Sequence, residues 1–263
     1  MNNLKFKVEA ELAASDFISS DFHLRDLNGG TVNSSYRLES LNKNYFLKTF
    51  ESDKIALLDR KKIFDIQLEL AGKGLAVKPI YLSKSRNFQI DQWLDFPTLE
   101  QSDVSSLTIT KSLASALSII HNTKINAPKL DLPHQWQHYI CLIDAPISLP
   151  EQQIIDNYAA IWYQACSTKS VFCHNDLSLS HVTYAQPSKI LDWEYCAISC
   201  PYFDLASCIA INCLSTADEA NLYAYYAQYS EQKLSEVIAK VSIMKPLVEL
   251  TNRLWYQAAS LST

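Results

Sequence analysis

The sequence feature that most constrains the fold is a change of hydrophobic pattern near Pro97. Before this residue, short apolar or alternating segments are separated by polar breaks, which favours β-strands. These segments cover residues 21–27, 31–40, 44–50, 75–82 and 88–94. Beyond Pro97 the apolar residues recur at helical spacing, as over 104–121, and residues 202–263 contain no glycine. The chain therefore predicts an α+β fold, with a small N-terminal antiparallel β-sheet lobe over 1–93 and a larger, mostly helical lobe over 94–263.

Composition limits the kinds of partner. The 263 residues are 48% hydrophobic, enough for a sizeable core, and the net charge of −5 provides no basic field for nucleic acid. No apolar stretch reaches the roughly 18 residues of a membrane span, and residues 1–14 lack the apolar core of a signal peptide. Seven cysteines without a CxxC pair are typical of reduced thiols. We expect a cytoplasmic protein that binds a small molecule, with neither nucleic acid nor membrane as partner; the oligomeric state stays open.

Chemically useful side chains are concentrated between residues 171 and 206. They are His174, Asp176, Asp192, Glu194 and Asp204. A strand, a turn around Pro187 and a returning strand would bring Asp176 and Asp192 together. One carboxylate could then accept a proton from an attacking hydroxyl while the other holds a divalent metal on a nucleotide. The spacing thus indicates phosphoryl transfer.

Two motifs in this stretch resemble a known family. His174-Asn175-Asp176, followed by Ile190 to Tyr195, resembles the paired signature of aminoglycoside phosphotransferase-like kinases. The Trp-Glu-Tyr form of the second motif, with Asp204 ten residues after Glu194, is similar to that of choline/ethanolamine kinases and bacterial thiamine kinases. The resemblance implies a two-lobed protein-kinase-like fold, ATP and Mg²⁺ as cofactors, and transfer of the γ-phosphoryl group to a hydroxyl.

The same resemblance assigns catalytic roles. It implies that Asp176 orients or deprotonates the acceptor hydroxyl, that Asp192 binds magnesium and that His174 orients the catalytic loop. One position departs from the pattern, because the family has a metal-binding Asn five residues after the catalytic Asp and this chain has His181. Imidazole suits softer metals than Mg²⁺, so as a metal ligand His181 should weaken magnesium binding or alter metal preference. A pseudokinase that binds nucleotide without turnover is the alternative.

The first hairpin turn is the candidate nucleotide loop. Locally, Gly29 and Gly30 indicate no more than an ordinary turn between two strands. The segment from Gly29 to Arg37 also resembles the nucleotide loop of these kinases. The resemblance implies that the two glycines approach the phosphates and that Asn33 and Ser34 lie near them.

The third strand-like segment contains Lys48 among large apolar neighbours, where an ammonium group needs an anionic partner. The family resemblance implies that this partner is the ATP phosphates. Residues 55–70 predict a helix in which Asp65 is the preferred acidic partner of Lys48, with Glu69 one turn later as the alternative. The resemblance places the adenine beside the segment 90–94.

The acceptor is expected to be a small cationic alcohol. Aromatic residues are frequent in the last third of the chain, and ring faces attract organic cations. Glu194, Asp204 and Trp255 are the substrate-side candidates, whereas His121 is interpreted as structural. The compact length and the run Ala76 to Pro79 resemble bacterial thiamine kinases, whereas the run Phe172 to Asp176 resembles choline kinases. The resemblance narrowly favours thiamine, with choline and ethanolamine as alternatives. A kinase of a macromolecular acceptor is a further alternative, which the acidic charge does not favour.

Overall fold

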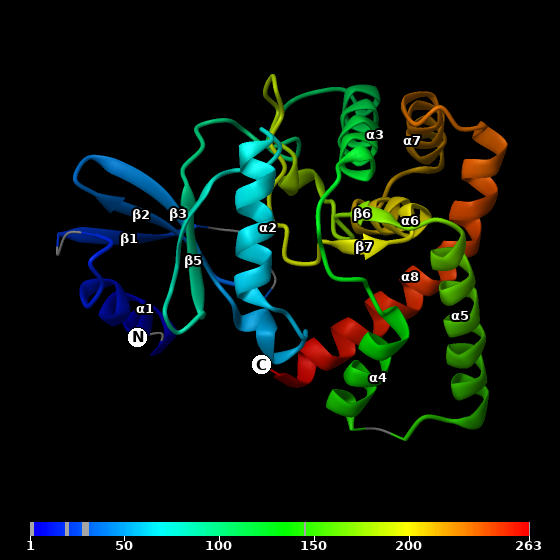
Figure 1. Ribbon diagram of the computed structural model, residues 1–263, viewed down its shortest axis with the longest axis horizontal. Helices are drawn as coiled ribbons and strands as arrows, with labels where there is room; N and C mark the ends of the chain where they lie inside the picture. The colour runs from blue at the N-terminus through cyan, green and yellow to red at the C-terminus, as the bar shows by residue number, and fades with distance from the viewer. Residues whose placement is uncertain (1–2, 19–20, 28–31, 145, 263) are drawn as a thin grey trace. The chain divides into compact units, whose positions relative to one another are not determined.

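Figure 1 shows a computed structural model of the chain. It describes residues 3–18, 21–27, 32–144 and 146–262. The chain divides into two compact units, residues 1–95 and 96–263. The boundary between residues 95 and 96 lies two residues beyond the predicted boundary, which was between residues 93 and 94. The functions expected of the two units stay predictions.

The first unit is built on an antiparallel sheet with strand order β1-β2-β3-β5-β4. Its strands are β1 (Phe22–Leu27), β2 (Ser35–Ser40), β3 (Lys43–Thr49), β4 (Pro79–Leu82) and β5 (Phe88–Gln92). The predicted five-stranded sheet is confirmed, with β2 and β4 each starting four residues later than expected. Leu41 and Asn42 connect β2 to β3 with φ of 48° and 60°, the left-handed conformation of a two-residue hairpin turn.

The two faces of this sheet differ in chemistry because side chains alternate along each strand. One face is apolar and is covered by α1 (Asn3–Ala13), a helix that was not predicted. Val8 and Leu12 of α1 form the core there, together with Tyr36, Leu38, Leu47, Phe88 and Ile90. The strand register places Lys48 beside Gln89 on the opposite face.

Helix α2 (Arg60–Gly72) lies on this second face. It begins five residues later than predicted, because the Asp59 side chain accepts a hydrogen bond from the Lys62 N–H and caps the helix there. The side-chain amide of Gln67 donates to Asp91 of β5 at 3.1 Å. A polar network therefore joins α2 to the face that carries Lys48.

The second unit is mostly helical, as predicted. Its helices are α3 (Ser106–Asn122), α4 (Leu132–Ile143), α5 (Leu149–Thr168), α6 (Pro201–Ile211), α7 (Thr216–Tyr229) and α8 (Leu234–Ser262). Helix α3 packs beside α7, and α4 and α6 pack against α8 (Figure 1). Among the residues that the structure describes, no helix combines the length and apolar character that crossing a membrane requires.

The stretch with the two motifs folds differently from the predicted hairpin. Strand β6 (Val171–Cys173) pairs with β7 (Ala197–Ser199). Strand β7 lies later in the chain than the segment around Asp192 that was predicted to form the returning strand of the hairpin. The chain between them doubles back through a single bridge, Val182 to Ile190, after the short 3₁₀ helix η2 (Leu179–His181). The prediction of a strand around Asp192 was wrong, although the turn around Pro187 exists.

Candidate active site

The loop that follows β6 carries the His-Asn-Asp motif, and a buried carboxylate of α6 holds its backbone. Asp204 accepts the N–H of Asn175 at 2.7 Å on one oxygen and the N–H of His174 at 2.9 Å on the other. The second oxygen also lies 3.0 Å from Nε2 of His121. Burial alone would raise the pKa of Asp204, but these bonds and the nearby histidines outweigh it and hold that pKa below its usual value. The loop therefore starts from a fixed backbone.

The expectation that Asp204 contacts substrate does not fit this geometry. The side chain is 0% exposed, and both of its oxygens are engaged by groups of the protein. It offers no surface to a ligand. His121, interpreted from sequence as structural, contacts Asp204 through one ring nitrogen and the Tyr226 hydroxyl through the other, at 2.7 Å.

His174 is fully buried and both of its ring nitrogens face backbone groups. The N–H of Asp176 donates to Nδ1 at 3.3 Å, so Nε2 carries the hydrogen and donates to the Leu191 carbonyl at 2.9 Å. Burial, with a smaller contribution from the neighbouring His181, lowers the pKa of His174 to about 4, so the ring is neutral at pH 7. It connects the Asp176 backbone to the segment that leads into Asp192.

His181 joins the two predicted catalytic carboxylate segments. Its Nδ1 lies 2.8 Å from the backbone carbonyl of Asp176, and its Nε2 lies 3.5 Å from Oδ2 of Asp192. The His181 carbonyl accepts the Leu191 N–H at 2.8 Å. Asp192 has a φ of 57°, a left-handed conformation uncommon for a residue other than glycine. The segments of Asp176 and Asp192 thus meet through the imidazole that replaces the expected Asn.

The donor atoms here are chemically suited to a divalent cation. A carboxylate oxygen and an imidazole nitrogen lie close together, and the side chains of His181 and Asp192 are 16% and 25% exposed. An ion could therefore reach them from solvent. Oxygen donors suit Mg²⁺, and imidazole suits transition metals.

Next to Asp192 in the chain, an aromatic and acidic group forms the candidate acceptor site. Nε1 of Trp255 on α8 donates to the Tyr195 hydroxyl at 3.2 Å. Burial raises the pKa of Tyr195 well above its usual value, and the nearby Glu194, Tyr139 and Asp176 raise it further. Glu194 is 9% exposed. Tyr195 was not predicted as a site residue, although its place in the Trp-Glu-Tyr motif was the available signal.

In the first unit, Ser34 is bound to a carboxylate of the protein. Its N–H and its hydroxyl donate to Glu51 at 2.9 and 3.0 Å, and the Thr49 hydroxyl donates to the same group at 2.5 Å. Asn33 accepts the N–H of Ser52 at 2.8 Å. A contact of Ser34 with phosphate would require exchange of the Glu51 bonds, and the predicted roles of both residues stay predictions. Gly29 and Gly30 lie outside the described residues.

Asp65 has a partner within its own helix. Its carboxylate lies 2.6 Å from the Lys61 ammonium, and Glu69 pairs in the same way with Lys73 at 3.5 Å. The role of Asp65 as partner of Lys48 gains no support from this geometry. Sequence reasoning did not single out Asp91, which accepts from Gln67 and Gln89 on the sheet face that carries Lys48.

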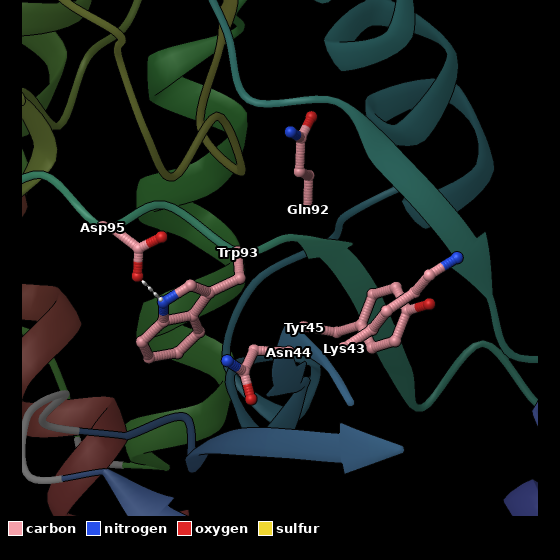
Figure 2. A pocket seen from close by; sticks show the side chains of 6 residues that line it. All are labelled: Lys43, Asn44, Tyr45, Gln92, Trp93 and Asp95. Atoms are coloured by element: carbon pink, nitrogen blue, oxygen red, sulfur yellow. Dashed lines mark hydrogen bonds between the residues drawn. The ribbon is translucent and has the colours of Figure 1, made fainter. Parts of the chain in front are cut away.

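A pocket of about 300 Å³ lies where the adenine was expected, at the end of β5. It is lined by Lys43, Asn44, Tyr45, Gln92, Trp93 and Asp95 (Figure 2). The Trp93 indole donates to Asp95 at 2.8 Å, and the Arg37 guanidinium lies 5.0 Å from the centre of the Trp93 ring. An aromatic plane held in this way is suited to stacking, but the adenine assignment stays a prediction.

The antiparallel sheet unit and the helical unit with its His-Asn-Asp loop define a protein-kinase-like phosphotransferase. The chain belongs to the phosphotransferase enzyme family, whose sequence profile matches residues 23–240. This match confirms the superfamily and the class of enzyme predicted from the motifs. No curated protein sequence matches the chain significantly.

Solved structures share the fold at low sequence identity. LicA in complex with AMP has a TM-score of 0.78 at 18% identity, with 99% of this chain and 91% of that chain covered. The choline kinase LicA from Streptococcus pneumoniae gives 0.73 at 21%, covering 97% and 90%. The ethanolamine kinase of Plasmodium vivax gives 0.74 at 14%, covering 97% and 83%. These likenesses confirm the predicted protein-kinase-like fold.

Proposed function

We propose that the protein transfers the γ-phosphoryl group of ATP to the hydroxyl of a small cationic alcohol. The observation that carries this proposal is the loop of residues 174–176, whose backbone is held by the buried Asp204 and connected through His181 to Asp192. Phosphoryl transfer depends mainly on positioning and on charge stabilisation, and a fixed loop that carries a carboxylate supplies positioning.

In this mechanism Asp176 orients the acceptor hydroxyl and accepts its proton, and the neutral His174 keeps the Asp176 backbone in place. Lys48 binds phosphate oxygens in the first unit, the role expected of a lysine on this strand. Asp192 and His181 would hold the divalent cation, which when bound neutralises charge on the nucleotide phosphates.

The residues of the candidate acceptor site favour a cationic substrate. Trp255 and Tyr195 contribute adjoining aromatic groups, and Glu194 lies next to Tyr195 in the chain. A permanent positive charge against ring faces gains roughly 0.5–2 kcal/mol per ring when desolvated, and a carboxylate adds to that attraction. We take thiamine as the first acceptor to test, with choline and ethanolamine as alternatives. Two of the solved structures of similar fold are a choline kinase and an ethanolamine kinase, which act on the alternatives.

The test is ATP consumption by the purified protein with Mg²⁺ or Mn²⁺, against thiamine, choline, ethanolamine and an aminoglycoside. We expect turnover of one cationic alcohol, reduced at least about a hundredfold in Asp176→Asn because a positioned base contributes that much. Asp103→Asn, at an exposed loop position, is the matched control and should retain activity. Nucleotide binding without turnover of any acceptor would contradict the proposal and favour the pseudokinase alternative.

A further inference from the structure

The ring of His181 has a defined tautomer whenever it is neutral. Nδ1 lies 2.8 Å from the backbone carbonyl of Asp176, and a carbonyl oxygen can only accept a hydrogen bond. Nδ1 therefore carries the hydrogen. A neutral imidazole has one N–H, so Nε2 presents its lone pair, and the atom it faces is Oδ2 of Asp192 at 3.5 Å.

Two acceptor atoms that face each other at this distance are arranged as metal ligands. The separation is longer than an ordinary N–H···O bond of about 2.7–3.2 Å. A histidine that binds a metal usually donates its other ring N–H to a backbone carbonyl or carboxylate, which fixes the ring orientation. His181 has this arrangement, since the Asp176 carbonyl fixes Nδ1 while Nε2 is directed to Asp192.

The position of the ring also connects the ion to the reacting residue. The carbonyl that fixes His181 belongs to Asp176, the residue expected to accept the hydroxyl proton. His174 donates to the Leu191 carbonyl, immediately before Asp192. An ion at Nε2 and Oδ2 would therefore be held by the same segments that position the proposed base.

We propose that Nε2 of His181 and Oδ2 of Asp192 together ligate the divalent cation, and that the imidazole shifts the preference of the site from Mg²⁺ towards Mn²⁺. Mg²⁺ favours oxygen donors in near-octahedral geometry, whereas first-row transition ions accept imidazole nitrogen readily. The proposal rests on the proposed function in one respect, which is that this cation is the one bound together with the nucleotide. Its test measures binding and coordination, not turnover.

The experiment is pulsed electron paramagnetic resonance of Mn²⁺ bound to the protein together with ATPγS. We expect nitrogen modulation from a directly bound imidazole, which changes to the ¹⁵N frequencies when the protein, but not the nucleotide, is ¹⁵N-labelled. The signal should disappear in His181→Asn. It should persist in His134→Asn, the matched control at an exposed position of α4.

Competition binding gives a second, independent readout. The ratio of Mn²⁺ to Mg²⁺ affinity should fall at least about tenfold in His181→Asn, the size of change typical for altered metal-site residues. The proposal would be overturned if the parent protein binds Mn²⁺ without imidazole coupling or binds no Mn²⁺. An unchanged ratio of Mn²⁺ to Mg²⁺ affinity in His181→Asn would also overturn it. In those cases His181 is a hydrogen-bonding residue only. Failure to phosphorylate any acceptor would overturn the proposed function and leave these readouts intact.

Discussion

Among the acidic residues that bind backbone N–H groups, Asp204 and Glu51 do so in opposite ways. Asp204 in the second unit is 0% exposed and binds the N–H groups of His174 and Asn175 and a ring nitrogen. Glu51 in the first unit is partly exposed and binds one N–H and two hydroxyls, those of Ser34 and Thr49.

The difference shows which region is fixed and which can exchange partners. Backbone N–H groups cannot rotate away, and the buried Asp204 has no water to compete for it, so the loop it holds is preorganised. Hydroxyl groups rotate, and a partly exposed carboxylate can be replaced by another anion. The comparison therefore predicts a rigid catalytic loop in one unit and an exchangeable anion contact in the other.

Removing the charge of Asp204 should have the largest effect. In Asp204→Asn, an amide group replaces one acceptor oxygen, so at least one buried N–H of the loop loses its partner. We expect a loss of about 3–5 kcal/mol in the free energy of unfolding, the range for breaking a buried charged network. Urea denaturation measures this loss. Asp103→Asn should stay within about 0.5 kcal/mol of the parent, and an Asp204→Asn loss as small as that would show that the loop does not depend on this carboxylate.

Protonation of His174 should have the next largest effect. Its folded pKa of about 4 lies below the unfolded value of 6.5, so the unfolded chain takes up the proton first as the pH falls. Stability should therefore decrease from pH 6.5 down to about 4, by up to ~3 kcal/mol from this group alone.

The measurement is the free energy of unfolding against pH for the parent and His174→Asn. The variant should be less stable at pH 7 but should lose less between pH 6.5 and 4 than the parent does. His134→Asn, on the exposed side of α4, should keep the parental slope. Equal slopes in the parent and His174→Asn would mean that the buried ring is not the group that titrates.

The sequence predicted the motifs well and their tertiary roles less well. The Asp176 and Asp192 segments were expected to meet, and they do so through His181, because the turn around Pro187 is local. The exposure of Asp204 could not be predicted, because it depends on how α6 packs against a loop about thirty residues earlier. Helix α1 was missed because its apolar residues acquire a partner only once the sheet exists.

The smallest expected effect concerns the exchangeable contact. Glu51→Gln removes a negative charge but leaves an oxygen that can accept from Ser34 or Thr49, so stability should fall by only about 1 kcal/mol. If Ser34 binds phosphate as predicted, the same change should tighten ATP binding by about 0.5–1 kcal/mol, roughly twofold to fivefold, because a nearby like charge is gone.

Calorimetric titration of ATP into Glu51→Gln measures this, with Glu236→Gln as the control because Glu236 is an exposed acid paired with Lys240 on α8. The control should bind ATP as the parent does. Loss of stability in Glu51→Gln with no gain in ATP affinity would mean that Glu51 only holds Ser34 and Thr49 in place. The predicted phosphate contact of Ser34 would then be wrong, and both acidic residues would serve to fix the backbone.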